Sequence, residues 1–411
     1  MPVLTNVAAL VTPPPPSAEA DATDLRRIED AALAWTDDTI EWVGPAPDLP
    51  SEFEEDPIHD AEGALVIPGL VDCHTHLAFA GWRADEFAVR LGGRSYQDIA
   101  KEGGGILDTV RKTRAAAEEE LYDRSRSFLR EMAHLGVTTV EAKSGYGLTA
   151  EDELKQLRVY RRLRENHPLR IVPTFLGAHT VPPEYEADRE GYLELLHVEL
   201  LPRVGQQNLA EFCDAFVEDG VFQPEEARRL FQTARQHGLR PKLHADQLSD
   251  TGGAALAAEV GAASADHLEH ISPEGIAAMA DAGVVAVSLP LATLYLDEDP
   301  LPVAAFREAD VPLAVATDFN PGTAPSYHLP FALTLACTLQ RMTPAEALAG
   351  ATRHAAAALN RDDEIGSLAP GMQADFALID APNLNQWLYH VRPNAAVATY
   401  VQGRRWTKQS A

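Results

Sequence analysis

Between Leu70 and Asp318 the chain repeats one pattern of hydrophobic and polar positions. A short run of β-branched or apolar residues ends in a polar residue, a loop follows, and an amphipathic stretch closed by Gly comes next. Eight such runs predict strands, at Leu70–Asp72, Val137–Ala142, Ile171–Leu176, Glu211–Val217, Lys242–His244, Ser264–His267, Val284–Leu289 and Leu313–Thr317. Strands that alternate with helices in this way predict an α/β fold, a (β/α)8 barrel of the TIM type, rather than an open sheet.

Residues typical of helix ends support this division. Thr149 followed by Asp152 resembles a capping box ahead of apolar residues at helical spacing. Pro224 begins a predicted helix that Gly238 ends. Three more glycines stand where a helix C-cap belongs: Gly136, Gly261 and Gly283.

The two ends of the chain have a different pattern. Residues 1–67 hold short strand-like pieces with a turn predicted at Trp42–Gly44, and a last helix is predicted through the Ala-rich residues 345–358. The tail then returns to strand patterns, at Phe376–Ile379 and Ala395–Val401. We therefore expect residues 1–67 and 365–411 to pair into a small composite β-sandwich beside a catalytic barrel of residues 68–364.

Composition and charge exclude several classes of protein. With 62 acidic against 34 basic side chains, the net charge of −28 argues against a protein that binds nucleic acid through its phosphates. Cys73, Cys213 and Cys337 are too few and too far apart for a disulfide framework, which favours a reducing cytosol. The N-terminus lacks the basic segment of a signal peptide, and no apolar run approaches the roughly 18–20 residues that span a bilayer. We therefore expect a cytoplasmic protein that acts on a small molecule, with no membrane partner.

The segment Pro68–His76 carries the first candidate chemistry. Residues i and i+2 of a strand point to the same side, so His74 and His76 can both face the mouth of a barrel. Two imidazoles on one strand end provide half of a metal site, although a lone His-x-His pair is also compatible with two packed histidines.

Other candidates fall at the same end of the predicted barrel. His244 ends the fifth predicted strand, His267 the sixth, and Asp318 follows the eighth. Barrels of this type carry their active sites at the C-terminal ends of the strands. We predict one divalent ion per chain, Zn or Fe, with ligands His74, His76, His244 and Asp318. His267 could replace one of these ligands, but we prefer it as a group that supports the site or faces the substrate.

Such an ion lowers the pKa of a bound water towards neutrality and so supplies hydroxide at pH 7. Asp318 can take a proton from that water and return it to a leaving nitrogen.

These residues resemble a known set. The Pro68–His76 opening, the ligands on strands five and eight, and the tail Gly366–Asp375 are similar to the amidohydrolase superfamily. Within it, the chain resembles the imidazolonepropionase family of histidine degradation over nearly its whole length. The segments that carry the closer resemblance are His74–Arg83, Lys143–Leu148, Phe175–His179, His244–Gln247 and Thr317–Thr323.

The resemblance implies hydrolysis of the cyclic amide of 4-imidazolone-5-propanoate to N-formimidoyl-L-glutamate. That substrate carries a carboxylate, for which Arg83, in the loop after the first strand, offers a bidentate guanidinium. A salt bridge within the loop is the alternative role for Arg83.

Further substrate-binding positions follow from the same resemblance. Tyr146 and His179 are expected to donate hydrogen bonds to the substrate, and Tyr96 is a weaker candidate. Beyond Asp318, the side chain, tight turn and backbone amides of Asn320, Gly322 and Thr323 are expected to hold its ring or tail, although Gly322 is also explained as a turn residue after Pro321.

Gln247 separates the possible activities. Ring deaminases of the superfamily carry a Glu three residues after the fifth-strand His, whereas Gln247 can orient a ring but cannot titrate. Asp246 is expected to point away from the mouth. The proton transfers then fall to Asp318, with His267 stabilising the developing oxyanion. Another mononuclear amidohydrolase, such as a heterocycle aminohydrolase, is the nearest alternative, and a catalytically silent binding barrel is a more distant one.

Lys143 bears on the number of metal ions. Binuclear amidohydrolases bridge two ions through a carboxylated Lys, usually on strand four, but Lys143 ends the second predicted strand and Glu211–Val217 contains no Lys. A single ion is therefore favoured, and Lys143 and Glu141 are expected to pair near the barrel rim. Cys73 should face away from the two histidines and pack. Barrels of this size often dimerise, so a homodimer is compatible with the sequence.

Overall fold

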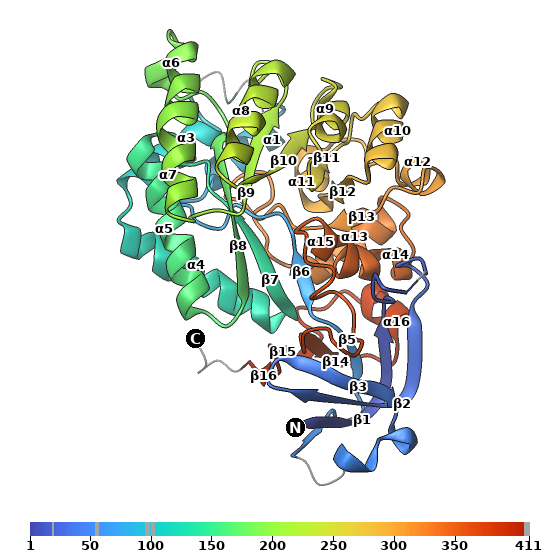
Figure 1. The fold of residues 1–411 in the computed structure, drawn as a ribbon. Helices are drawn as coiled ribbons and strands as arrows, with labels where there is room; N and C mark the ends of the chain where they lie inside the picture. The colour runs from blue at the N-terminus through green and yellow to red at the C-terminus, as the bar shows by residue number, and fades with distance from the viewer. Residues whose placement is uncertain (19, 54–56, 95–98, 100–102, 407–411) are drawn as a thin grey trace.

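The computed structural model describes residues 1–411 except 19, 54–56, 95–98, 100–102 and 407–411. Two eight-stranded sheets form the framework of the described chain. One is a parallel barrel surrounded by helices, and the other lies below it in Figure 1 and contains strands from both ends of the chain.

The barrel confirms the expected fold class. Its neighbouring strands pair in parallel, in the order of the chain from β6 to β13. They are β6 (Leu70–Asp72), β7 (Val137–Lys143), β8 (Arg170–Ala178), β9 (Phe212–Val217), β10 (Arg240–Ala245), β11 (Ser264–His267), β12 (Val285–Ser288) and β13 (Leu313–Val315). All eight predicted strands are present, because apolar runs of this kind suit strands that are buried on both faces.

The barrel closes where its first strand meets its last. The carboxylate of Asp72 accepts hydrogen bonds from the backbone N–H of Thr317 at 3.0 Å and from its hydroxyl at 2.6 Å. Just beyond, the N–H of Asp318 donates to the carbonyl of His74 at 3.0 Å, and the N–H of His76 donates to the carbonyl of Phe319 at 2.9 Å. This seam holds the first and last candidate ligands together through backbone bonds.

Helices follow most barrel strands and cover the outside (Figure 1). The longer ones are α1 (Ala84–Leu91), α3 (Ile106–Ala115), α4 (Glu118–His134), α5 (Ala150–Asn166), α8 (Pro224–Gln236), α10 (Pro273–Ala282) and α13 (Leu329–Thr338). The shorter ones are α6 (Arg189–Glu194), which continues as a π-helical stretch (Leu195–Leu200) into α7 (Leu201–Gln206), then α9 (Gly253–Glu259), α11 (Pro290–Leu296), α12 (Val303–Glu308), α14 (Pro344–Gly350), α15 (Arg353–Ala357) and α16 (Leu384–Tyr389). Single 3₁₀ turns occupy Ala46–Asp48, Ser51–Phe53 and Pro183–Tyr185.

The capping residues act largely as the sequence indicates. The hydroxyl of Thr149 accepts from the N–H of Asp152 at 3.2 Å and begins α5, and Gly283 ends α10 with a left-handed φ of 66°. The single helix predicted over residues 345–358 is wrong, because Thr352 leaves the helical conformation (φ −131°, ψ −93°) and separates α14 from α15. Nor is that the last helix, since α16 follows.

Strands from both termini join one mixed sheet, in the order β16-β15-β14-β5-β1-β2-β3, with β4 beside β1. They are β1 (Val3–Thr12), β2 (Arg26–Thr36), β3 (Thr39–Pro45), β4 (Ile58–Asp60), β5 (Leu65–Pro68), β14 (Phe376–Ile379), β15 (Ala396–Val401) and β16 (Arg404–Arg405). The two chain ends meet where β14 pairs antiparallel with β5.

The composite unit is therefore present, and its layers belong to one continuous sheet that bends over its own core. The indole of Trp35 on β2 packs against Phe376 and Tyr400 of the C-terminal strands at ring distances of 5.4 and 5.9 Å. The turn predicted at Trp42–Gly44 is wrong, because those residues lie within β3 and the chain reverses at Asp37, whose φ is 53°. We propose the domain division expected above, residues 1–67 with 365–411 and residues 68–364.

None of the helices in the described ranges combines the length and the apolar character needed to cross a membrane.

One buried histidine predicts how stability depends on pH. His167 caps the C-terminal end of α5, and burial, assisted by Arg130 and Arg126, lowers its pKa from 6.5 to about 4. The unfolded chain then binds a proton at a higher pH than the folded chain does, so stability is lost as the pH falls from about 6.5 towards 4. We expect His167 to contribute about 2–3 kcal/mol to the loss of unfolding free energy between pH 8 and pH 4.5. Urea unfolding at both pH values should show a smaller loss in His167→Gln, and an equal loss in both proteins would contradict this.

Candidate functional site

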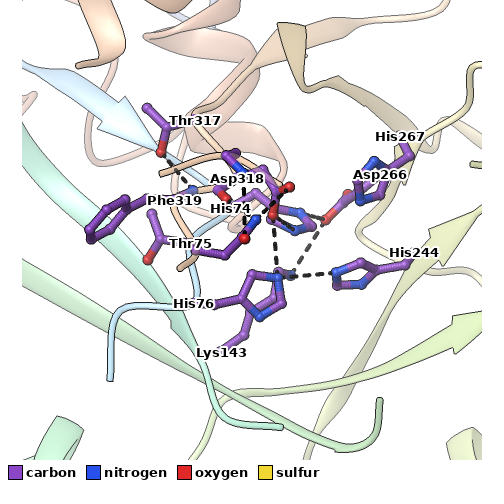
Figure 2. A network of polar contacts seen from close by, with 12 residues as sticks. His74, Thr75, His76, Lys143, His244, Asp266, His267, Thr317, Asp318 and Phe319 are labelled. Carbon is purple, nitrogen blue, oxygen red and sulfur yellow. Dashed lines mark hydrogen bonds and ion pairs between the residues drawn. The ribbon is translucent and has the colours of Figure 1, made fainter. Parts of the chain in front are cut away.

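The predicted metal ligands meet at the C-terminal end of the barrel. The Nε2 atoms of His74 and His76 each lie 3.4 Å from Oδ1 of Asp318. The Nε2 atoms of His76 and His244 are also 3.4 Å apart. Figure 2 shows these side chains converging from β10 and from the segments that follow β6 and β13. The four residues that the sequence indicates are therefore brought together.

This cluster has the dimensions of a metal site. Ligand bonds of about 2.1 Å at tetrahedral angles place neighbouring ligand atoms about 3.4 Å apart, which is the spacing of the three pairs above. Within the described structure, Nε2 of His74 is buried without a hydrogen-bond partner. Two sets of ligand atoms lie within 4.8 Å of one another, His74 with His76 and His244, and His74 with His267 and Asp318. The donors present therefore fit a divalent metal ion.

Two aspartates that the sequence analysis missed orient the ligand histidines. Asp266 on β11 lies 2.6 Å from Nδ1 of His74, and Asp214 on β9 lies 3.0 Å from Nδ1 of His244. A carboxylate on Nδ1 leaves the Nε2 lone pair facing the centre, as metal-binding histidines require. For Asp214 the available signal was an Asp within the otherwise apolar strand β9, since a buried carboxylate needs a partner. Asp266 stands out less, because its strand β11 also contains Ser264 and His267.

His267 is placed beside the cluster, on a backbone with a left-handed φ of 80°. Burial lowers the pKa of its imidazole well below the usual value, so the ring is neutral. Its Nδ1 lies 3.9 Å from Oε2 of Glu269, a buried carboxyl that accepts a hydrogen bond from Thr293 at 2.8 Å. Burial raises the pKa of Glu269 to about 8.

Asp318 is held by the loop that follows it. Its backbone has a φ of 52°, and the Asn320 amide donates to its Oδ2 at 3.0 Å. Burial alone raises the pKa of Asp318, but His74 and His76 outweigh that effect and hold it well below the usual value. Asn320 Oδ1 accepts from the N–H groups of Gly322 and Thr323, both at 2.8 Å. Those two amides, expected to bind substrate, are instead occupied within the loop.

Arg83 and Gly322 are in direct contact. The Arg83 side chain is buried and lines the pocket above the cluster. A Cβ at Gly322 would lie 1.7 Å from its Nη2 and 2.0 Å from its Cζ, so only glycine leaves room for the guanidinium. Gly322 is therefore required by this close approach rather than by a positive φ. The alternative role considered for Arg83 has a counterpart in a contact of 4.0 Å between its Nη1 and Oε2 of Glu86.

The loop after β7 places Tyr146 against the histidines. The buried Glu153 carboxylate accepts from the N–H groups of Gly147 at 2.8 Å and Leu148 at 2.9 Å and so fixes the loop. His179 follows β8, and its ring stacks on His76 with centroids 5.2 Å apart.

His179 differs from expectation in its hydrogen-bonding role. Its Nδ1 lies 2.9 Å from the carbonyl oxygen of Gly145, which can only accept, so Nδ1 carries the proton. Burial lowers the pKa of the ring well below the usual value, so the imidazole is neutral. Its Nε2 therefore accepts a hydrogen bond rather than donating one.

One pocket lies at the mouth of the barrel, and the polar residues that line it are His76, Arg83, Tyr146, His179, His244, Gln247, His267, Asp318, Asn320 and Thr323. Gln247 lies on its wall, on a segment held by Glu218, which accepts from the N–H of Leu248 at 2.8 Å. Four apolar wall residues were not predicted, because any apolar residue in a barrel has a packing explanation: Ile106, Phe216, Leu248 and Leu296. Leu296 is the last residue of α11.

Comparison with known proteins decides the family. The model of the amidohydrolase family matches residues 92–406. Imidazolonepropionase from Cupriavidus taiwanensis is 50% identical over 387 residues, which is 93% of this chain and 92% of that protein. Imidazolonepropionase from Geobacillus thermodenitrificans is 48% identical over 90% of this chain and 88% of that protein. The chain belongs to the imidazolonepropionase family of amidohydrolases.

Solved structures agree with this placement at the level of the fold. Guanine deaminase from E. coli superposes with a TM-score of 0.76 at 16% identity, over 99% of both chains. An adenosine deaminase from Xanthomonas campestris, with bound zinc, gives a TM-score of 0.72 at 19% identity, over 98% of this chain and 92% of that one. The imidazolonepropionase family thus shares its architecture with ring deaminases, so fold alone does not separate the two reactions.

Three remaining expectations for this imidazolonepropionase-family chain have clear outcomes. Asp246 points away from the mouth, as predicted, and accepts from the N–H groups of Gly253 and Ala254 at 2.9 Å at the start of α9. Cys73 is fully buried, as expected for packing. Lys143 and Glu141 do pair, at 2.9 Å, but both are fully buried beneath the ligands rather than at the rim. Tyr96 lies outside the described residues.

Proposed function

We propose that this enzyme hydrolyses the cyclic amide of 4-imidazolone-5-propanoate to N-formimidoyl-L-glutamate. The observation that carries the proposal is the buried guanidinium of Arg83 in the same pocket as the histidine and aspartate cluster. A buried cation there fits a substrate that carries a carboxylate at one end and a hydrolysable ring at the other. A neutral purine or pyrimidine gives Arg83 no such partner.

His74, His76, His244 and Asp318 would hold one divalent ion, Zn or Fe. A divalent ion held by these residues would lower the pKa of a bound water and would polarise a carbonyl group.

The chain's own residues orient the ring. With the carboxylate on Arg83, the ring reaches towards Tyr146, His179 and Gln247 on the same pocket. Nε2 of His179 accepts from a ring N–H, and Tyr146 donates to a ring acceptor. The Gln247 amide both donates and accepts but does not titrate, so it orients the ring without moving a proton.

Two residues handle the charge that develops during hydrolysis. Asp318 takes the proton of the attacking water and delivers it to the ring nitrogen that leaves as the amide bond breaks. The neutral imidazole of His267 faces this point and donates its N–H to the oxyanion that forms on the carbonyl oxygen. Asn320 keeps the Asp318 carboxylate in place through the 3.0 Å bond to Oδ2.

The test is turnover by the purified holoenzyme. We expect freshly prepared 4-imidazolone-5-propanoate to lose its ultraviolet absorbance, with N-formimidoyl-L-glutamate as the product, no released ammonia and about one metal ion per chain. The propanamide analogue, which lacks the negative charge, should be a poor substrate because Arg83 cannot pair with it. Bound metal without turnover of the acid, together with ammonia release from heterocyclic amines, would instead identify an aminohydrolase.

We also propose a cytoplasmic location, because Cys73, Cys213 and Cys337 are all unpaired. A homodimer is a hypothesis that the mass of the protein in solution tests.

A further inference from the structure

Lys143 lies at the end of β7, directly beneath the ligand histidines, with its side chain fully buried. Its ammonium group contacts three carboxylates: Asp214 Oδ2 at 2.8 Å, Glu141 Oε1 at 2.9 Å and Asp266 Oδ2 at 3.4 Å. An ammonium has three donors, and each is directed at one of these carboxylates. Figure 2 shows Lys143 among the ligands, with its contact to Asp266 dashed.

Two of those carboxylates are the ones that orient ligand histidines. Oδ2 of Asp266 contacts both Lys143 and Nδ1 of His74, and Oδ2 of Asp214 contacts both Lys143 and Nδ1 of His244. One cation therefore joins the supports of two ligands that come from different strands.

The second oxygen of each carboxylate is fixed separately. Oδ1 of Asp266 accepts from the hydroxyl of Ser264 at 2.5 Å, and Oδ1 of Asp214 accepts from the backbone N–H of His244 at 3.1 Å. The contact with Lys143 then fixes the direction in which each Oδ2 faces its histidine.

The charges of this group support one another. Burial by itself raises the pKa of Asp214, but His244 and Lys143 outweigh it and hold that pKa well below the usual value. Burial likewise raises the pKa of Asp266, but Lys242, Lys143 and His74 outweigh that effect and hold the pKa below the usual value. Burial by itself lowers the pKa of Lys143, but the three carboxylates outweigh that effect and raise it above the usual value.

Lys242 provides a natural comparison within the same core. It is also fully buried, but its ammonium donates to the carbonyl of Cys73 at 3.1 Å and lies 3.4 Å from Glu141. Its ammonium has no ion pair within 4.0 Å to Asp214 or Asp266 in the described structure. The two lysines therefore match in charge, size and burial and both contact Glu141, but of the two only Lys143 forms ion pairs with Asp214 and Asp266 in the described structure.

We propose that Lys143 is a positioning residue for the metal centre, which it serves by holding Asp214 and Asp266 in the orientation that aims His244 and His74 at the ion. This inference rests on the metal centre of the proposed function. Loss of the residues that support ligand histidines typically lowers metal affinity 10–100-fold, and Lys143 acts on two such supports at once.

The experiment compares zinc affinity in the full-length wild type, Lys143→Met and Lys242→Met. Each metal-free protein is titrated with Zn²⁺ in competition with a chromophoric chelator, and its folded fraction is measured by circular dichroism. We expect a loss of affinity of about 10–100-fold in Lys143→Met and a loss below about 3-fold in Lys242→Met. The visible spectrum of the Co²⁺-loaded protein, which reports ligand geometry, should change in Lys143→Met alone.

Several outcomes would overturn the inference. Equal losses in the two lysine variants would mean that affinity follows total buried charge rather than the contacts of Lys143. Unchanged affinity in a folded Lys143→Met, with zinc bound by the wild type, would remove the positioning role and leave the proposed function intact. If the wild-type protein took up no metal, both the positioning role of Lys143 and the proposed function would be contradicted.

A second variant covers poor folding of Lys143→Met. Lys143→Gln keeps an amide donor without the charge and should still lose affinity relative to Lys242→Gln. Asp214→Asn should add little to the loss in a Lys143→Gln background, because both changes disturb one support. If the two substitutions instead lowered zinc affinity independently, so that their fold-losses multiplied in the double variant, the inference would be contradicted.

Discussion

The Asp318→Asn variant is expected to lose about 10³–10⁴-fold in kcat for 4-imidazolone-5-propanoate, with a much smaller change in KM. Asparagine has nearly the same shape and tolerates the left-handed backbone found at this position. It cannot take up a proton, however, and the site loses the negative charge that lies 3.4 Å from His74 and His76. Steady-state kinetics with saturating Zn²⁺ measure the effect.

A metal titration separates the two duties of Asp318. If the variant is inactive even when fully loaded, the loss belongs to proton transfer, whereas recovery at high Zn²⁺ would leave Asp318 as a ligand only. Asp246→Asn is the matched control, because this buried aspartate also follows a barrel strand but bonds to the start of α9. We expect it to lower stability and to leave kcat within a few-fold, and a similar collapse of kcat in Asp246→Asn would contradict the assignment.

The Arg83→Ala variant should lower kcat/KM about 10²–10³-fold, mainly through KM, because the substrate carboxylate then enters a buried site without its charged partner. Gly322→Ala should have much the same effect although it removes no functional group. Its methyl carbon would lie 1.7 Å from Nη2 of Arg83 and must displace the guanidinium. Initial rates across a range of substrate concentrations test both variants.

The control for Gly322→Ala is Gly92→Ala. Gly92 is exposed at the end of α1 with a φ of −79°, and a Cβ there has its nearest neighbour at 3.2 Å. That variant should keep wild-type kinetics. In the Arg83→Ala background, Gly322→Ala should lower kcat/KM little further, because the guanidinium that it displaces is already gone. If the double variant instead lost a further factor of about 10²–10³ in kcat/KM, Gly322 would act independently of Arg83.

The barrel could be predicted from the sequence because each strand is a short apolar run between helices with recognisable ends. Thr149, Gly283 and the eight strand segments follow local rules that the structure does not override. The interruption at Thr352 was not predictable in this way, because an Ala-rich stretch has high helix propensity and no Gly or Pro stands at the position where the backbone leaves the helical conformation.

In the candidate site, too, some residues could be predicted from local sequence patterns and others could not. His74, His76, His244 and Asp318 were identifiable because strand ends converge on one face of a barrel. Asp214, Asp266 and the donor state of His179 depend on which atoms meet across different strands, and no pattern along one chain records that. The requirement for Gly322 likewise comes from Arg83, more than two hundred positions earlier in the sequence.

The seam between β6 and β13 has a consequence for protein synthesis. His74 and His76 leave the ribosome early, but the backbone bonds that fix them come from Asp318 and Phe319, after most of the chain has been translated. An unfinished chain can therefore offer two histidines to a metal ion but not the assembled cluster. The cluster is complete only after the last barrel strand has emerged, because Asp318 follows β13.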